Sequence, residues 1–536
     1  MKSGALGGFP NPPAKEDAKQ SSASPTRAAP RLDAKLLASG HVFPPQLAVP
    51  PTKPLPEKVL QFGEGNFLRA FVDWMLGRLN GRGLFGGRVV LVQPIAAGMA
   101  RQVNEQDGLY TVILRGLADG RIVESREIVS AVSRCLDPYQ DFDAFIACAA
   151  NPDLRFVVSN TTEAGIRTDP ADALDARPSP SFPGKLTQLL YARFTATSGA
   201  PDKGLVMLPC ELIERNGDAL ARAVTETAER WRLGDGFARW LRETCVFTNT
   251  LVDRIVTGYP KDEAAELSSQ LGYDDQLLVT GEVFHSWVIE SPRPLDGELP
   301  FGKAGLDVTW TADMTPYRER KVRILNGAHT MTVLAAYLAG KETVRECMDD
   351  PLIRGYMERG IEQEILPTLS LPRADVAAFA RSVSERFSNP FIKHYLTSIA
   401  LNSVSKYKAR ILGTVLDYTR ANGKLPPRLT FALAALFAFY RGSDIRDGAL
   451  IGRRGGADYR IQDAAQVLAA FRDAWLAAGE RPTDDAFLAL VRGLLARAEL
   501  WGKDLTTALP GFDAAVARDL ANICRLGVRA ALEAVA

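Results

Sequence analysis

The residues with the clearest chemical potential are one lysine, one asparagine and one histidine in the run Lys-Val-Arg-Ile-Leu-Asn-Gly-Ala-His, namely Lys321, Asn326 and His329. On an α-helix, at about 100° per residue, Asn326 lies ~140° and His329 ~80° from Lys321, so the three side chains share one broad face. A lysine with a near-neutral pKa can protonate a developing alkoxide, an asparagine can donate to that oxygen, and a histidine can orient substrate hydroxyls. The alternative is a solvated helix face with one satisfied histidine.

A second candidate site is a glycine-rich turn that lies between an apolar run, 59–62, and a segment with helical periodicity. The turn contains Gly63, Gly65, Asn66 and Phe67. Glycines at a strand–helix turn let the backbone approach a pyrophosphate, and the helix N-terminus offers free N–H groups with a partial positive charge. Leu68 replaces the third glycine of the usual dinucleotide fingerprint. An ordinary glycine turn therefore remains an alternative.

The residues leave the choice between NAD and NADP open. The next apolar run, 89–92, ends in Gln93 rather than in the acidic residue that usually binds the adenosine ribose of NAD. Gln93 can still hydrogen-bond a ribose hydroxyl, whereas Arg101 could attract the 2′-phosphate of NADP.

The other reactive residue types predict no metal centre. The cysteines are far apart and form no CxxC pair; they are Cys135, Cys148, Cys210, Cys245, Cys347 and Cys524. Of the four histidines, only His285, His329 and His394 lie in the part expected to fold. Without an HxH, HExxH or cysteine cluster, we expect no transition metal and the reduced thiols of a cytoplasmic protein.

The elements that must position these residues follow two patterns. In the first half, short apolar runs alternate with helical segments; the runs are 59–62, 89–92, 109–114, 155–159 and 205–208. This alternation predicts an α/β fold with a Rossmann-like, doubly wound parallel sheet. Beyond about residue 315 the strand signals fade, and long amphipathic stretches predict a mostly α-helical domain; they are 333–338, 375–386, 429–440 and 464–478.

Length and composition predict two domains and a tail. We expect residues 1–54, rich in Pro, Ala and Ser, to be disordered or loosely packed, 55–312 to form the dinucleotide-binding domain, and 313–536 to form the helical substrate domain. The net charge of +1 gives no electrostatic case for a nucleic-acid or membrane partner. No apolar run is long enough to span a bilayer, and the first residues lead into prolines rather than a signal core, so we expect a cytoplasmic location.

The Lys-x4-Asn-x2-His spacing resembles the active-site pattern of the polyol-specific long-chain dehydrogenases, the mannitol dehydrogenase family. Further segments resemble that family in the same order along the chain; they are 107–111, 160–165, 249–255 and 389–392. The resemblance runs from about residue 57 into the 500s and leaves only the N-terminal tail uncovered.

The resemblance implies an NAD-dependent, metal-independent hydride transfer in which Lys321 is the acid–base group, Asn326 stabilises the charged oxygen and His329 positions the substrate. It also implies that Glu163 relays the proton of the lysine, although a helix-capping carboxylate is an equal alternative. The remaining implied contacts are Gly63, Gly65, Asn66, Phe67, Gln93 and Asn160 for the cofactor, and Asp253, Lys406 and Arg410 for the substrate. Asp253 could instead form a buried ion pair with Arg254, and Lys406, Lys408 and Arg410 could be a solvated basic face.

Two departures from the polyol enzymes indicate a changed substrate. Glu211-Leu212 stands where those enzymes carry an Asp-Asn pair, and Ser398 stands where they carry an arginine. The runs 59–69, 181–187 and 208–213 are similar to members that act on hexuronates. The resemblance thus implies reversible reduction of tagaturonate to altronate, with fructuronate or a mannitol-type polyol as the alternative substrate. A protein that binds NAD without turnover is disfavoured, because a sensor has no use for a positioned proton donor. The oligomeric state stays open.

Overall fold

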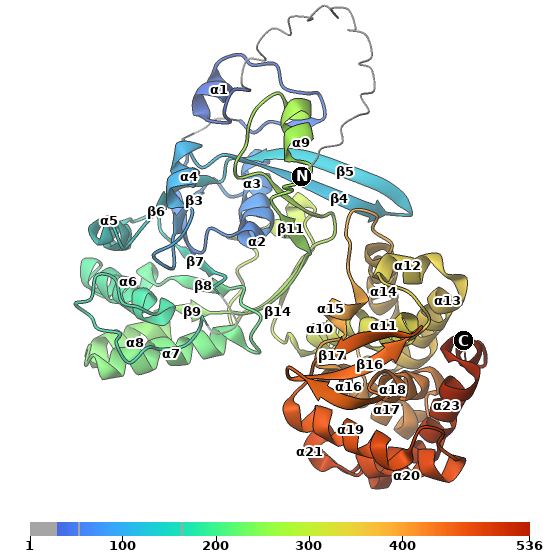
Figure 1. The fold of residues 1–536 in the computed structure, drawn as a ribbon. Coiled ribbons are helices and arrows are strands. Elements are labelled where there is room, and N and C mark those ends of the chain that lie inside the picture. The colour runs from blue at the N-terminus through green and yellow to red at the C-terminus, as the bar shows by residue number, and fades with distance from the viewer. Residues whose placement is uncertain (1–28, 52–53, 162–164, 536) are drawn as a thin grey trace, which may run out of the picture.

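A six-stranded, all-parallel sheet forms the centre of the N-terminal domain in the computed structural model, which describes residues 29–51, 54–161 and 165–535 (Figure 1). Its strands in spatial order are β6 (Val132–Leu136), β3 (Arg88–Val92), β2 (Glu57–Phe62), β7 (Phe156–Ser159), β8 (Val206–Pro209) and β9 (Val246–Phe247). The order runs outward in both directions from the pair β2 and β7, which confirms the predicted doubly wound sheet.

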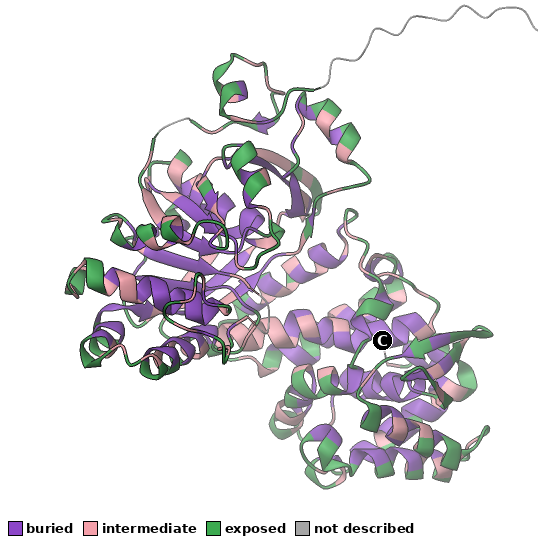
Figure 2. Ribbon diagram, turned by 60° about the vertical axis from the view of Figure 1, so that its left-hand side comes forward, coloured by how far each residue is buried: buried purple, intermediate pink, exposed green. Residues whose placement is uncertain are grey.

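Helices cover both faces of this sheet, and strand alternation explains why. Val89 and Leu91 of β3 belong to one hydrophobic cluster, and Val90 and Val92 to another. The first face carries α2 (Asn66–Leu68), a π-helical turn (Arg69–Asp73), α3 (Trp74–Gly81) and α4 (Ala100–Glu105). The second carries α5 (Phe142–Ala147), α6 (Phe182–Ala196), α7 (Asn216–Arg230) and α8 (Asp235–Thr244). The strands are buried between these layers (Figure 2).

The apolar run 109–114 belongs to a different sheet from the one predicted. Its residues 110–114 lie in β4 (Tyr110–Ala118), which pairs antiparallel with β5 (Arg121–Val129) in a mixed five-stranded sheet. The other strands of this sheet are β1 (Leu47–Ala48), β11 (Val256–Gly258) and β12 (Val279–Glu282). Asp119 and Gly120 both adopt positive φ at the β4–β5 turn. An Asp-Gly pair is a common hairpin turn, so this was the sequence signal that distinguished the hairpin from a parallel strand.

Residues 29–51 dock on the N-terminal domain through three buried leucines, so the expectation of disorder over 1–54 does not hold for them. They form α1 (Ala34–Ala38) and β1, which runs parallel to β5. Leu32, Leu36 and Leu47 are buried in a cluster with residues of β4 and of α9 (Ala264–Leu271). Three buried leucines are enough to hold the segment on the domain, although its average composition is that of a disordered chain.

The C-terminal domain is mostly helical, as predicted. Its helices are α10 (Thr315–Arg320), α11 (Gly327–Leu338), α12 (Val344–Asp349), α13 (Pro351–Gly360), α14 (Arg373–Phe387), α15 (Leu396–Ile399), α16 (Ser403–Arg410), α17 (Leu412–Asn422), α18 (Pro427–Phe439), α19 (Ala465–Ala478), α20 (Asp484–Leu495), α21 (Ala498–Trp501), α22 (Leu505–Ala508), α23 (Phe512–Leu526) and α24 (Val528–Glu533). The sequence pattern missed a three-stranded antiparallel sheet of β15 (Gly442–Arg446), β16 (Ala449–Arg454) and β17 (Ala457–Ile461).

A further small sheet, of β10 (Asn249–Asp253), β13 (Ser286–Glu290) and β14 (Val308–Thr311), belongs to the N-terminal domain. No helix in the described ranges has the length and apolarity to cross a membrane.

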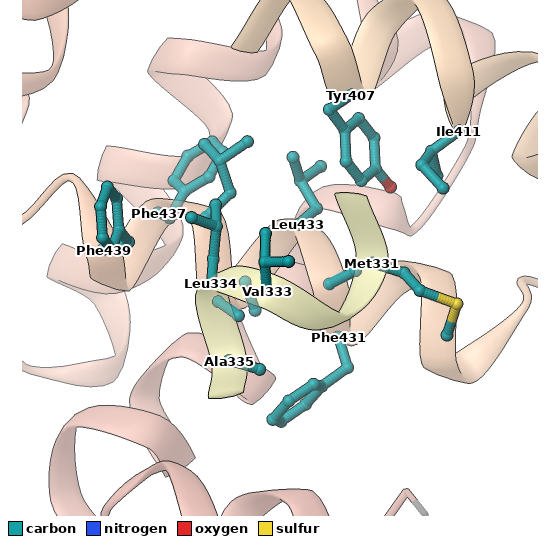
Figure 3. Close-up of a cluster of buried hydrophobic side chains, with 14 of the residues drawn as sticks. Met331, Val333, Leu334, Ala335, Tyr407, Ile411, Phe431, Leu433, Phe437 and Phe439 are labelled. Atoms are coloured by element: carbon teal, nitrogen blue, oxygen red, sulfur yellow. The ribbon is translucent and has the colours of Figure 1, made fainter. Parts of the chain in front are cut away.

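Helix α18 is the centre of the C-terminal core. Every residue from Leu429 to Phe439 is buried, so this helix is apolar all round rather than amphipathic as expected. Its Phe431, Leu433 and Phe437 lie beside side chains of α11 (Figure 3). This contact fixes α11, and α11 carries His329 on its first turn.

Candidate active site

Two neighbouring cavities meet at Asp253 and Lys321, which line both. The first has a volume of about 350 Å³ and is also lined by Asn326, His329, Arg386, His394, Ser398, Lys406 and Arg410. The second has a volume of about 410 Å³ and is also lined by Phe67, Asn160, Thr161, Glu211, Leu212 and Arg254. The predicted acid–base lysine therefore stands between a polar cavity rich in cations and a cavity at the carboxyl ends of the parallel strands.

A π-helical turn (Lys321–Asn326) between α10 and α11 positions the first two residues of the predicted triad. In a π-helix each N–H bonds to the carbonyl five residues earlier, so residues five apart lie on one side of the helix. The expectation of regular α-helical spacing was thus wrong in detail, although all three side chains line one cavity. Arg323 points away and donates to Asp417 at 2.8 Å.

Lys321 is held by the end of β10. Its Nζ donates to the carbonyl oxygen of Val252 at 2.7 Å and lies 4.0 Å from Oδ1 of Asp253. Burial lowers the pKa of Lys321; the carboxylate of Asp253 opposes this shift, and the guanidinium of Arg386 adds to it. A buried lysine with a lowered pKa exchanges its proton more readily near neutral pH than an exposed lysine does.

The imidazole of His329 is buried among aromatic rings, in surroundings that favour its neutral form. Its ring is stacked on Phe387 at a centroid distance of 4.1 Å and meets the ring of His394 edge-on at 5.1 Å. Burial lowers the pKa of His329 well below 6.5, and the electrostatic interactions with His394 and Arg410 lower it further. Its Nδ1 is buried and has no hydrogen-bond partner among the described residues. A buried ring nitrogen of this kind can accept or donate a hydrogen bond to a ligand hydroxyl.

Asp253 forms a buried ion pair, but its partner is Arg386 and not the neighbouring Arg254. Both oxygens of Asp253 accept from Arg386, at 2.9 and 3.1 Å. Arg254 instead donates to the carbonyl oxygens of Ala70, Val283 and Phe284 and lies over the ring of Trp74. Asp253 also lines both cavities, so its ion pair with Arg386 lies at the candidate site itself.

The basic residues of α16 separate into two groups. Lys406 and Arg410 line the first cavity, whereas Lys408 is exposed and lines neither cavity. Nζ of Lys406 donates to the carbonyl oxygen of Ile399 at 2.8 Å, and Nη1 of Arg410 lies 3.4 Å from the hydroxyl of Thr330. Ser398 lines the same cavity. A guanidinium has five N–H donors, so Arg410 retains capacity for a ligand.

The glycine turn stands at the carboxyl ends of β2 and β7, where doubly wound sheets bind dinucleotides. Gly63 has φ +118°, and a Cβ there would meet the carbonyl oxygen of Asn160 at 3.1 Å, so the close approach of β2 and β7 requires a glycine. A Cβ on Gly65 would meet nothing within 4 Å, so this side of the turn is open. Asn66 uses its side-chain oxygen to accept from Arg69, and Asn160 donates to the carbonyl of Cys210.

Gln93, predicted to meet a ribose, lies at the end of β3 and bonds to the loop that follows it. Its Nε2 donates to the carbonyls of Ile95 and Ala96, and its Oε1 accepts from the N–H of Ala100. These bonds use the amide to hold the loop 94–99. Arg101 is exposed, and its Nε lies 3.8 Å from the carboxylate of Glu105.

Glu211, which replaces a residue of the polyol enzymes, is buried beside the second cavity. It accepts from the hydroxyl of Ser159 and from both the N–H and the hydroxyl of Thr161, each at 3.1 Å. Burial raises its pKa. Leu212 is exposed and lines the same cavity. Glu163, the predicted proton relay, lies outside the described residues.

Sequence reasoning missed three charged or titratable residues of the site. Arg386 and Glu282 form a buried ion pair beside Lys321, and His394 lines the first cavity. Arg386 stood in an amphipathic helical pattern that gave no signal of burial. Among the described residues, no group of three or more His, Cys, Asp or Glu side chains is arranged to hold a metal ion.

Comparison with known proteins identifies relatives of both domains. The mannitol dehydrogenase Rossmann domain matches residues 57–303, and the mannitol dehydrogenase C-terminal domain matches residues 313–524. The altronate oxidoreductase of Yersinia enterocolitica is 46% identical over 485 residues, which cover 90% of this chain and 98% of that protein. The altronate oxidoreductase of Cronobacter sakazakii is 47% identical over 478 residues, which cover 89% and 96%.

Solved structures share the fold at lower identity. A D-sorbitol dehydrogenase in substrate-free form superposes with a TM-score of 0.77 at 22% identity, covering 94% of this chain and all of that chain. The mannitol 2-dehydrogenase of Pseudomonas fluorescens, in a ternary complex with NAD and D-mannitol, gives a TM-score of 0.65 at 23% identity, covering 94% and 99%.

Proposed function

The chain belongs to the mannitol dehydrogenase family, and we propose that it is an NAD-dependent altronate oxidoreductase that interconverts tagaturonate and altronate. The family follows from the match of both domain models and confirms the resemblance seen in the sequence. Two relatives are altronate oxidoreductases, and they are 46% and 47% identical to this chain over about nine-tenths of its length. The substrate, the cofactor and the roles of single residues are our proposal.

The observation that carries the choice of a sugar acid is the charge of the first cavity. Lys406 and Arg410 line it together with Lys321, and the carboxylate of Asp253 in its wall is already bound by Arg386. Among the described residues, Lys406 and Arg410 form no ion pair with a carboxylate, so the cavity offers their positive charge to a ligand. A charge-assisted hydrogen bond to a substrate carboxylate contributes about 1.5–3 kcal/mol, which a neutral polyol cannot gain.

The second cavity and the glycine turn fit a dinucleotide. The open side of Gly65, at the N-terminus of the helical run that begins with Asn66, suits a pyrophosphate, and Gly63, Phe67 and Asn160 complete the residues that would hold the cofactor. When bound, NADH supplies the hydride for the ketone carbon of the substrate.

The protein's own groups manage the proton and the orientation. In reduction, Nζ of Lys321 donates a proton to the developing alkoxide oxygen, the side-chain amide of Asn326 donates a hydrogen bond to the same oxygen, and His329 orients a neighbouring hydroxyl. In oxidation, Lys321 must be neutral to take the proton back, and its burial favours that form. We also propose that Glu163 relays the proton of Lys321.

A substrate and cofactor panel tests this proposal. The purified protein is assayed with tagaturonate, fructuronate and fructose in reduction, and with altronate and mannitol in oxidation, each with both nicotinamide cofactors. We expect kcat/KM for tagaturonate with NADH to exceed the value for fructose by at least about tenfold, the ratio given by one charge-assisted hydrogen bond. Equal values for altronate and mannitol would remove the sugar-acid proposal, and a preference for NADPH would remove the cofactor proposal.

A further inference from the structure

Arg386 connects the two domains beside the reacting lysine. It lies on α14 of the C-terminal domain, and its guanidinium is buried against two carboxylates of the N-terminal domain, Asp253 at the end of β10 and Glu282 at the end of β12. Nε and Nη2 donate to Glu282 at 2.9 and 2.8 Å, while Nη1 and Nη2 donate to Asp253 at 3.1 and 2.9 Å. One planar cation thus binds two carboxylates bidentately.

This arrangement decides where the carboxylate of Asp253 points. Both of its oxygens accept from Arg386, and Oδ1 lies 4.0 Å from Nζ of Lys321, beyond hydrogen-bond distance. Nζ donates instead to the uncharged carbonyl of Val252. Glu282 is held in turn by Arg386 and by the N–H of Ile255, at 2.6 Å.

We propose that Arg386 is a positioning residue that holds both oxygens of Asp253 and so prevents a close ion pair between Asp253 and Lys321, leaving Lys321 free to exchange its proton with the substrate. The inference rests on the proposed function, in which Lys321 is the acid–base group. Arg386 lies outside the Lys–Asn–His triad, and its charge and fork geometry set the proton affinity of the lysine.

Among the described residues, Arg386 is the side chain whose N–H groups donate to Asp253, and the other charges around Lys321 make no such bond. The titratable and charged groups that face Lys321 in the described structure are Asp253 on β10, Glu282 on β12, Arg386 on α14, His329 on α11, Lys406 and Arg410 on α16, and Glu211, Arg254 and His394 in loops. On α10, Arg320 lies over the ring of Phe379. The carboxylate of Asp253 raises the pKa of Lys321, and Arg386 lowers it.

The direction of the expected change follows from these signs. In an Arg386→Met variant the cation is lost, and the carboxylate of Asp253 is released toward the ammonium form of Lys321. Both effects favour the charged lysine, so the pKa of Lys321 rises, by about one unit or more for a carboxylate within hydrogen-bond reach. Alcohol oxidation, which needs neutral Lys321, then begins at higher pH than in the unmodified protein.

The ionisation of Lys321 can be measured without any substrate. The full-length protein is labelled with trace acetic anhydride across a pH series, and the labelled fraction of the Lys321 peptide is read by mass spectrometry. We expect the pH of half-maximal labelling, the Lys321 midpoint, to lie below 10.5 in the unmodified protein and to rise by about one pH unit in Arg386→Met. In Arg386→Lys, which keeps the charge but not the fork, the midpoint should return part of the way to the unmodified value. The pH profile of altronate oxidation should shift in parallel.

Two further variants separate positioning from a general loss of packing. Arg428→Met breaks a comparable buried pair, Arg428–Glu364, that lines neither cavity, and it should leave the Lys321 midpoint unchanged. Asp253→Asn should lower the Lys321 midpoint, because it removes a carboxylate that raises the pKa of the lysine. This variant tests the inference if Arg386→Met does not fold. An unchanged midpoint in a folded Arg386→Met protein or in Asp253→Asn, or an equal shift in Arg428→Met, would overturn the inference. Failure to turn over tagaturonate would instead remove the proposed function and leave the labelling result intact.

Discussion

Lys321 and His329 both lose solvent on folding, and the loss favours the neutral form of each. Burial is the largest influence on the pKa of both side chains and lowers both values. Their chemistry differs because their contacts differ. Lys321 keeps a carboxylate within 4.0 Å, so its ammonium form stays accessible, whereas the described groups around His329 include several cations. The lysine is thus suited to exchange a proton and the histidine to form neutral hydrogen bonds.

Replacing Lys321 by alanine should abolish most catalysis and little else. We expect kcat for tagaturonate reduction to fall by roughly two or more orders of magnitude, because general acid–base catalysis is lost. NADH affinity, measured by fluorescence titration, should change less than about twofold, a negligible free energy. Lys408→Ala is the matched control, since Lys408 lies on the exposed side of α16. Activity of Lys321→Ala within a few-fold of the unmodified protein would contradict the assigned role.

Lys406 should contribute to the choice of substrate through its charge. In Lys406→Met the ammonium is lost while most of the aliphatic chain remains, so kcat/KM for tagaturonate should fall about tenfold or more. The value for a neutral ketose such as fructose should change much less. Lys408→Met, which removes the same charge outside the cavity, is expected to leave the ratio of the two substrates unchanged. A parallel fall for both substrates would show that Lys406 supports the fold of the site rather than binding a carboxylate.

At the scale of elements, apolar periodicity predicted the parallel strands well, because β2, β3, β7 and β8 are buried on both faces. It could not assign the run at 109–114 to a sheet, since burial alone does not identify a strand's partner. The half-exposed strands β5 and β15 lack a continuous apolar run and were missed. Sequence patterns report how much an element is buried, and the pairing depends on contacts distant in the chain.

In the site, too, local features could be predicted from the sequence and long-range contacts could not. The spacing Lys-x4-Asn-x2-His brought three cavity residues together from one short segment, and local geometry was enough for that. Arg386 comes from another helix and meets Asp253 across 133 positions of the chain. The side-chain amide of Gln93 bonds to the loop that follows it, and nothing in the sequence indicated these bonds. Long-range pairs and local hydrogen-bond competition are both invisible in a single sequence.

The N-terminal segment provides a stability test at this scale. Leu32 is fully buried between the segment and the sheet of β4 and β5, whereas Val42, ten positions later, is 89% exposed. Leu32→Ala should lower the free energy of unfolding by about 2–4 kcal/mol, as for other buried leucines. Val42→Ala should change it by less than about 0.5 kcal/mol. Denaturant unfolding followed by circular dichroism measures both values, and equal small effects would mean that the segment does not dock in solution.

At the scale of the whole molecule, the hairpin of β4 and β5 reaches from one domain to α14 of the other (Figure 1). The N–H of Gly120 at its turn donates to Glu385, and the side chain of Asn389 donates to the carbonyl of Arg115. Arg386 adds its two ion pairs to the same helix. The helix that receives the hairpin thus also carries the cation that holds Asp253 beside Lys321.

The distribution of charge over the molecule predicts how salt affects the reaction. The chain carries a net charge of only +1, so its overall field does little to attract an anion, while Lys406 and Arg410 concentrate positive charge at one cavity. Raising the ionic strength from about 0.05 to 0.5 M shortens the screening length to a few Å, which weakens that local attraction. We expect kcat/KM for tagaturonate to fall several-fold over this range through a rise in KM. The slope should flatten in Arg410→Met, which removes one of the two charges, and should be unchanged in Lys408→Met. If Arg410→Met keeps the full salt dependence, the attraction of the acid substrate arises elsewhere on the protein.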